Sequence, residues 1–187
     1  MKAIMQQRED IRQNQVWIEM LNTPKFNMKK MYMAVHDRAQ KVVWRTLFYG
    51  NVARPRALIT LWHACHERLA TRDRLHKYGA IDIIHSCFCN TEETQRHLMF
   101  NCSETKGIWR KVLDWIQVDH NPLGWRQEME WIIQQTKEKG DRAKILKLTF
   151  TESVYEIWRY RNATSFGNVD MNQHTDSKII DTIVYRG

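Results

Sequence analysis

The residues best suited to chemistry are three cysteines and one histidine that lie close together in the sequence. The stretch CFCNTEETQRHLMFNC has the spacing Cys87-x-Cys89-x7-His97-x4-Cys102. Thiolates and imidazole are the ligands of tetrahedral zinc, which accepts both sulfur and nitrogen. Residues two apart in an extended segment face the same side, so Cys87 and Cys89 can both bind one ion. The pattern predicts a zinc site with His85 as a reserve ligand. Four protein ligands would leave no open position, so the Zn²⁺ would be structural.

A second interpretation of this stretch is a set of buried, inert thiols beside one hydrogen-bonded histidine. It stays open because Cys-x-Cys is an uncommon opening for a zinc knuckle. The local signals predict a short helix between two loops, with Thr91 as its N-cap. A five-residue step rotates by about 140° on a helix, so the helix must end between His97 and Cys102. Asn101 can take the left-handed conformation of such an ending. Cys65, on an apolar helical face, is expected in the core.

Helices must position these residues, because the hydrophobic pattern has helical periodicity almost throughout. The 187 residues are 43% hydrophobic, with 8 Trp but only 3 Pro and 7 Gly, which is typical of a packed helical chain. The predicted fold class is all-α: a compact multi-helix domain with a small zinc-knuckle-like loop–helix insertion. We expect an N-terminal helix and linker over 1–24, a helical domain over 25–166, and a tail with a short helix over 167–187.

Positive charge is concentrated in one segment. Residues 38–77 hold nine Lys or Arg against Glu67 and Asp73, which accounts for +7 of the net charge of +8. This concentration is typical of a polyanion site, nucleic acid before membrane, although a solvated helical face would have the same composition. Trp44, Trp62 or Tyr78 are candidate stacking surfaces, although a place in the core is the preferred interpretation for Trp44 and Trp62. The candidate phosphate contacts are Arg45, Arg54, Arg56, Arg68, Arg72, Arg74 and Lys77.

Other classes of protein find little support in the sequence. One of the longest apolar runs, 57–62, is far shorter than the roughly 20 residues that span a bilayer. The first residues lack the apolar stretch of a signal peptide, so an intracellular protein of the nucleus or cytoplasm, without a membrane partner, is expected. His63-x-x-His66 differs from the metalloprotease spacing His-Glu-x-x-His. With no nucleophile–base pair either, an enzyme is not expected.

Further motifs follow one another along the chain. KFNMKKMYMAV is similar to a Phe-Ser-x-Lys-x-x-Tyr element, and EETQRHLMFNCSETKGIWRKVLDW to a Glu-Thr-x-x-His-Leu-x-Phe-x-Cys-x6-Trp signature. SVYEIWRYRNATSF is similar to an Ile-Trp-x-x-Arg-Asn-x-x-x-Phe element. A long pattern between the first two falls on Trp44, Pro55, Trp62, Leu69, Thr71, Leu75 and Gly79. In this order, the motifs resemble the zinc-binding domain downstream of the polymerase in plant non-LTR (LINE-type) retrotransposon reverse transcriptases.

The resemblance covers about residues 25–166 and gives Cys89, His97 and Cys102 family ligand positions. The family usually opens with Cys-x-x-Cys, whereas here Ser86 stands at the first cysteine. Either Cys87 serves after a local shift, or the site has three protein ligands. The chain shows no Tyr-x-Asp-Asp polymerase signature, so it looks like a piece of such a polyprotein or a stand-alone gene derived from one.

Two functions follow as hypotheses. The first, implied by the resemblance, is a non-catalytic, zinc-stabilised module that binds the backbone of RNA or DNA through the basic helical segment. The second is a domesticated protein–protein interaction or regulatory factor that no longer binds nucleic acid. Candidate phosphate contacts buried in intrachain salt bridges would favour the second.

Overall fold

The computed structural model describes residues 42–138, 140–167 and 180–183, together with Ile18, Asn22 and residues 27–29. The chain divides into two units, Met1–Val42 and Val43–Gly187. Most of the first unit lies outside the described residues, and so do most of the predicted helix and linker over 1–24. The fold is therefore that of the second unit.

Every element of the described residues is helical, as predicted, and an antiparallel bridge between His85 and Glu92 is isolated. Among these residues, no helix is long and apolar enough to cross a membrane. Residues 180–183, in the predicted tail, are also helical. The elements in chain order are η1 (Val43–Leu47), α4 (Pro55–Cys65), α5 (Arg72–Lys77), η2 (His97–Asn101), α6 (Ser103–Trp115), α7 (Trp125–Gln135) and α8 (Asp141–Phe166).

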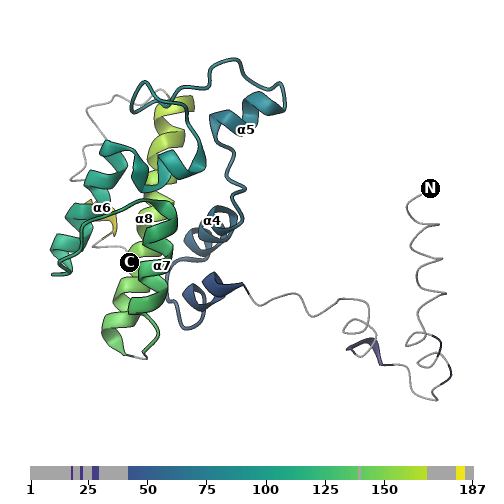
Figure 1. The fold of residues 1–187 in the computed structure, drawn as a ribbon, viewed down its shortest axis with the longest axis vertical. Helices are drawn as coiled ribbons and strands as arrows, with labels where there is room; N and C mark the ends of the chain where they lie inside the picture. The colour runs from purple at the N-terminus through teal and green to yellow at the C-terminus, as the bar shows by residue number, and fades with distance from the viewer. Residues whose placement is uncertain are drawn as a thin grey trace. The chain divides into compact units, whose positions relative to one another are not determined.

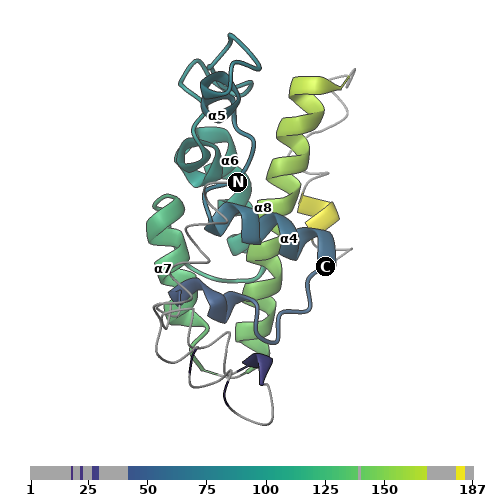
Figure 2. The same cartoon turned by 90° about the vertical axis from the view of Figure 1, so that its right-hand side faces the viewer.

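The long helix α8 is the central element of this unit. It contacts α4, α6 and α7, and Figure 2 shows α4 crossing it. Its buried apolar residues Leu146, Phe150, Val154 and Ile157 recur every three or four positions, so they form one continuous face. Gly140 precedes the helix and Gly167 follows it. Because α4, α6 and α7 all pack on α8, this helix determines the positions of the segments that connect them in the chain (Figure 1).

An aromatic cluster fills the core beside α8. The ring centroids of Phe100 lie 5.6 Å from Trp109 and 5.9 Å from Phe150, and Trp125 stacks on Phe150 at 6.1 Å. These four side chains are almost fully buried. Phe100 belongs to η2, the segment that also carries His97. The packing of the core therefore anchors the Cys/His stretch.

Candidate metal centre

A tight turn presents the first cysteines. The Ser86 N–H donates to the Thr91 carbonyl at 2.8 Å, and the Glu93 N–H donates to the Ile84 carbonyl at 2.8 Å. The chain between these bonds reverses direction instead of running extended. The expectation that residues two apart would face one side therefore fails here, and the turn gives Cys87 and Cys89 different surroundings.

The segment that carries His97 is a short irregular helix. The backbone N–H of His97 donates to the Thr94 hydroxyl at 3.1 Å, so Thr94 has the capping role predicted for Thr91. Thr91 instead forms a backbone hydrogen bond in the preceding turn. The helix ends before Cys102, as predicted. The left-handed residue is Phe100, with φ 72°, and not Asn101. A non-glycine residue is disfavoured there, and the buried aromatic cluster holds Phe100 in place.

The reversal brings three side chains together. The Sγ atom of Cys89 lies 3.0 Å from Nε2 of His97 and 3.9 Å from Sγ of Cys102. All three atoms lie within 4.8 Å of one another. A zinc ion about 2.3 Å from two sulfurs at tetrahedral angles would separate those sulfurs by about 3.8 Å. The two sulfurs therefore have the separation of two ligands of one tetrahedral ion, whereas the Sγ–Nε2 distance of 3.0 Å is shorter than the roughly 3.5 Å that such positions require.

The thiols of this cluster differ in acidity. Loss of solvent opposes ionisation of Cys89, but hydrogen bonds with the Thr91 backbone and the His97 ring outweigh it and lower its pKa to about 7. Burial raises the pKa of Cys102. Thiolates are the species that bind metal. The Cys89 thiol is thus the one that ionises more readily near neutral pH, while the Cys102 thiol would lose its proton when a cation binds.

The remaining candidate ligands lie outside the cluster. The Sγ atom of Cys87 is 4.0 Å from the Arg161 carbonyl, and burial raises the pKa of its thiol. His85 does not belong to the cluster either. Cys65 packs against the core, as expected, with its pKa raised by burial to about 12. Ser86 is buried, and its Oγ accepts a hydrogen bond from the Phe88 N–H at 3.2 Å.

A buried ion pair connects the turn that carries Cys89 to helix α8. Arg161 of α8 forms a salt bridge with Glu93, and its Nε donates to Glu93 Oε1 at 2.9 Å. The same oxygen accepts the Arg72 N–H at the start of α5, also at 2.9 Å. Sequence reasoning did not assign this pair. A signal existed, because Glu93 and Arg161 each occupy a named position in one of the quoted motifs.

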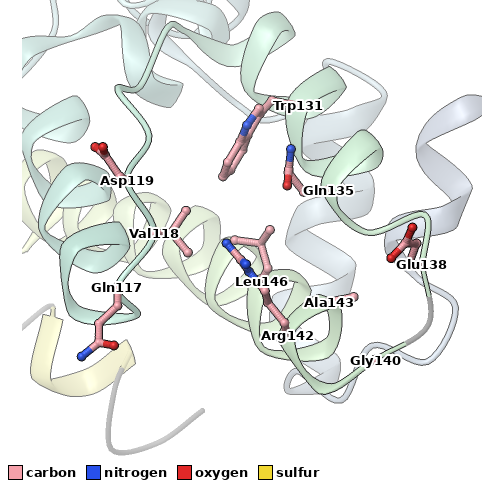
Figure 3. A pocket seen from close by; sticks show the side chains of 10 residues that line it. All are labelled: Gln117, Val118, Asp119, Trp131, Gln135, Glu138, Gly140, Arg142, Ala143 and Leu146. Carbon is pink, nitrogen blue, oxygen red and sulfur yellow. The ribbon is translucent and has the colours of Figure 1, made fainter.

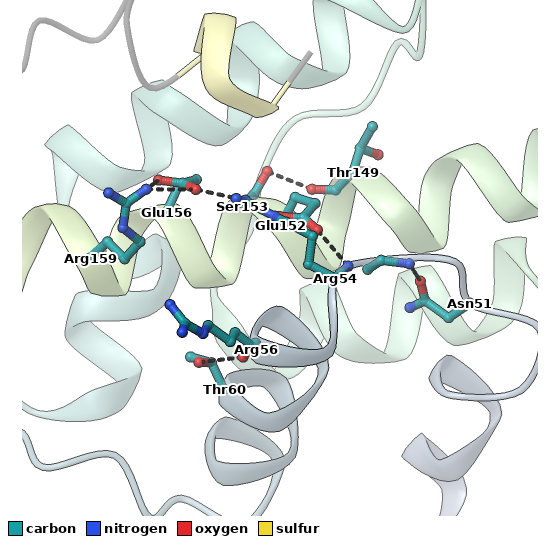
Figure 4. A network of polar contacts seen from close by, with 10 residues as sticks. Asn51, Arg54, Arg56, Thr60, Thr149, Glu152, Ser153, Glu156 and Arg159 are labelled. Carbon is teal, nitrogen blue, oxygen red and sulfur yellow. Dashed lines mark hydrogen bonds and ion pairs between the residues drawn. The ribbon is translucent and has the colours of Figure 1, made fainter. Parts of the chain in front are cut away.

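The basic residues do not form one free surface. Arg54 forms salt bridges with Glu152 and Glu156, which are buried on α8 (Figure 4). Arg159 shares Glu156 with it. These bonds give Arg54 a raised pKa, its hydrogen bond to Glu152 being the largest cause. Arg54 therefore fixes α4 to α8.

Other cations of the segment are also held by the chain. Arg72 donates to the His85 carbonyl at 2.5 Å, and Arg74 to the Glu67 carbonyl at 2.5 Å. Lys77 lies 3.9 Å from Asp73. The Arg45 guanidinium lies 5.9 Å from the centre of the Tyr49 ring. Two members of the predicted set, Arg56 and Arg68, are exposed and have no ion-pair partner among the described residues.

A cavity of about 570 Å³ lies elsewhere, between the end of α6, α7 and the start of α8 (Figure 3). Trp131, Gln135 and Arg142 are among its lining residues. None of the three cluster residues lines it. It therefore offers no substrate pocket for a metal at the Cys/His cluster.

The comparisons with known proteins agree with the motifs. Residues 26–109 match the model of a family described as zinc-binding in reverse transcriptase. The match confirms the resemblance over a segment that includes all three cluster residues. No curated protein and no solved structure matches the chain. The assignment to plant, LINE-type elements stays a prediction.

Proposed function

We propose that residues 26–109 belong to a structural zinc-binding module of the reverse-transcriptase type, and that the chain binds nucleic acid without catalysing a reaction. The observation that carries the proposal is the cluster of Cys89, His97 and Cys102. Its sulfur–sulfur distance of 3.9 Å suits one tetrahedral ion. An ion there would tie the turn, η2 and the start of α6 together. Its contribution would be folding energy.

The nucleic-acid part of the proposal is supported by charge. No Asp or Glu occurs from residue 38 to residue 66, where five Lys or Arg occur. Contacts between such residues and phosphates position a protein on nucleic acid without reading its sequence. They also release counterions, so binding weakens as salt rises.

The second candidate, a protein-interaction factor, is favoured by a specific observation. Arg54 is engaged in salt bridges within the chain, and Arg72 and Arg74 are bonded to carbonyls. A charge already paired with a carboxylate gains little from a phosphate. The nucleic-acid proposal therefore depends on the cations that stay free.

Both parts can be tested on the untagged full chain. Elemental analysis should find one zinc per chain, and the affinity for labelled single-stranded RNA and DNA should fall with rising salt. A folded chain without zinc would contradict the metal site. A zinc-loaded chain that binds neither RNA nor DNA at low salt would contradict nucleic-acid binding and leave the second candidate.

A further inference from the structure

The outward face of α4 differs from the other helix surfaces that carry the basic segment. Ala57, Leu61 and Ala64 are fully buried. Arg56, Ile59 and Trp62 follow at three-residue steps and are exposed, Trp62 by 39% of its surface. Residues at this spacing share one side of a helix. Arg56 and Trp62 each adjoin Ile59 but are about 120° apart around the helix axis, so they lie on either side of Ile59 on one broad exposed surface.

Aromatic rings gather around Trp62 at the C-terminal end of α4. The His66 ring lies 4.4 Å from Trp62 and 4.9 Å from Trp44 of η1, measured between ring centroids. The His63 ring lies 5.1 Å from Trp62. Trp62 is thus held by its neighbours while more than a third of it faces solvent. We call Trp44, Trp62, His63, His66, Arg56 and Arg68 the α4 platform.

Among the described residues, no carboxylate forms an ion pair with Arg56 or Arg68. Arg56 is exposed, and its backbone carbonyl accepts a hydrogen bond from Thr60 Oγ1 at 3.0 Å (Figure 4). Arg68 follows His66 by two residues and is also exposed. The intervening acid, Glu67, is bound by Arg96 at 3.0 Å. Within the part of the chain that the structure describes, α4 and the turn after it therefore carry exposed positive charge and an exposed indole, and the one acid of this stretch, Glu67, is already paired.

We propose that the α4 platform binds single-stranded nucleic acid, with unpaired bases stacked on Trp62 and phosphates contacting Arg56 and Arg68. The inference rests on the proposed nucleic-acid function and assigns it a surface and a substrate class. Stacking requires an unpaired base because a duplex covers the faces of its bases. Aromatic side chains together with cations are the usual means of binding single strands without sequence preference.

The test compares two exposed tryptophans in the zinc-loaded full chain. Trp62→Ala removes the stacking ring, and Trp115→Ala removes a tryptophan of α6 that is 54% exposed. The probe is a labelled oligo(dT), measured by fluorescence anisotropy beside a duplex of equal length. Trp62→Ala should weaken binding by roughly 5- to 100-fold, and Trp115→Ala should leave it unchanged. Trp62→Phe, which keeps an aromatic face, should retain most of the affinity.

The electrostatic part has its own readout. Arg56→Gln should weaken binding to the single strand. It should also make the plot of log affinity against log salt less steep, by the amount that about one phosphate contact contributes to the slope. The wild-type chain should prefer the single strand to the duplex. Zinc content and thermal unfolding of each variant show whether the fold is intact. If Trp62→Ala does not fold, Trp62→Phe and Arg56→Gln decide between the outcomes.

The outcomes separate the two levels of the proposal. One outcome is that the wild-type chain binds oligo(dT) and that the two single variants, Trp62→Ala and Arg56→Gln, bind it as tightly as the wild type. In that case the α4 platform is overturned and the proposed function stands. If the duplex binds as tightly as the single strand, base stacking is overturned. If the wild-type chain binds neither, the proposed function fails, and a protein partner becomes the better occupant of this face.

Discussion

At the scale of residues, the candidate ligands differ in how the chain holds them. Cys102 is buried at the start of α6, His97 is fixed by its backbone bond to Thr94, and Cys89 lies in the preceding turn. Cys87 lies beside Arg161 instead. Three ligands from two separate segments would be joined by one ion, so the loss of any one should release it.

We expect His97→Ala and Cys102→Ser each to lose most of the bound zinc and to lower the midpoint of thermal unfolding. Each substitution removes one of the three candidate ligands, and a structural site is weakened when a ligand is lost. Elemental analysis and calorimetry on the purified full chain measure the two effects. Cys65→Ser and Cys87→Ser are the matched controls, because their thiols lie outside the cluster. Zinc loss with Cys87→Ser would return that residue to the site.

At position 86, where the family usually has its first cysteine and this chain has serine, a substitution is predicted to strengthen zinc binding. Ser86 lies at the start of the turn that contains Cys89, bonded across it to Thr91. A thiolate there would complete four protein ligands, and zinc prefers thiolate to hydroxyl. Ser86→Cys should therefore bind zinc at least about tenfold more tightly in competition with a chelator, in line with the range seen for changes around metal sites. Equal affinity would mean that the turn keeps residue 86 away from the ion.

At the scale of elements, α8 connects segments that are far apart in the sequence. It pairs Glu152 and Glu156 with Arg54 before α4, and Arg161 with Glu93 behind the Cys/His turn. Both sides of the second pair are almost fully buried, at 1% and 0% side-chain exposure. The position of the turn therefore depends on α8, although α8 supplies no candidate ligand.

Arg161→Met should lower the free energy of unfolding by about 3–5 kcal/mol, because it leaves the buried Glu93 carboxylate without its cationic partner. Urea unfolding monitored by circular dichroism measures the change. Arg159→Met is the matched control on the same helix, where a partly exposed pair should contribute at most about 1 kcal/mol. The double variant Glu93→Gln with Arg161→Met should recover part of the loss. Equal effects of the two single variants would contradict the role given to the buried pair.

At the scale of the whole molecule, the matched family segment is smaller than the packed core. Residues 26–109 include Leu98, Phe100 and Trp109, but their partners Trp125 and Phe150 lie beyond the match. Ile183 is also buried, at 2% exposure. The second unit, Val43–Gly187, contains all of these residues.

We therefore expect a chain of residues 43–187 to fold and to bind one zinc. A chain of residues 26–109 should stay largely unfolded, because it exposes apolar surface that α7 and α8 cover. Circular dichroism, cooperative thermal unfolding and zinc analysis of both chains test this. A cooperative, zinc-loaded 26–109 chain would show that the metal, and not α8, organises the family segment.

The sequence by itself determined the helical class and pointed to Cys87, Cys89, His97 and Cys102 as candidate ligands, three of which the structure brings together. Both are local properties: helical periodicity depends on neighbouring residues, and the candidate ligands lie within a short stretch with a recognisable spacing. The helix ending between His97 and Cys102 followed from the same local geometry, although not the residue that makes the turn.

Only the tertiary structure decided which predicted residues are free to act. Arg54 and Glu152 are 98 residues apart, and Glu93 and Arg161 are 68 residues apart. No local pattern reveals that such charges meet. The separation of Cys87 from the cluster likewise depends on a turn that is closed by bonds between backbone groups, which every residue possesses. The exposed face of α4 follows from what α8 covers, so the proposed nucleic-acid surface required the folded chain.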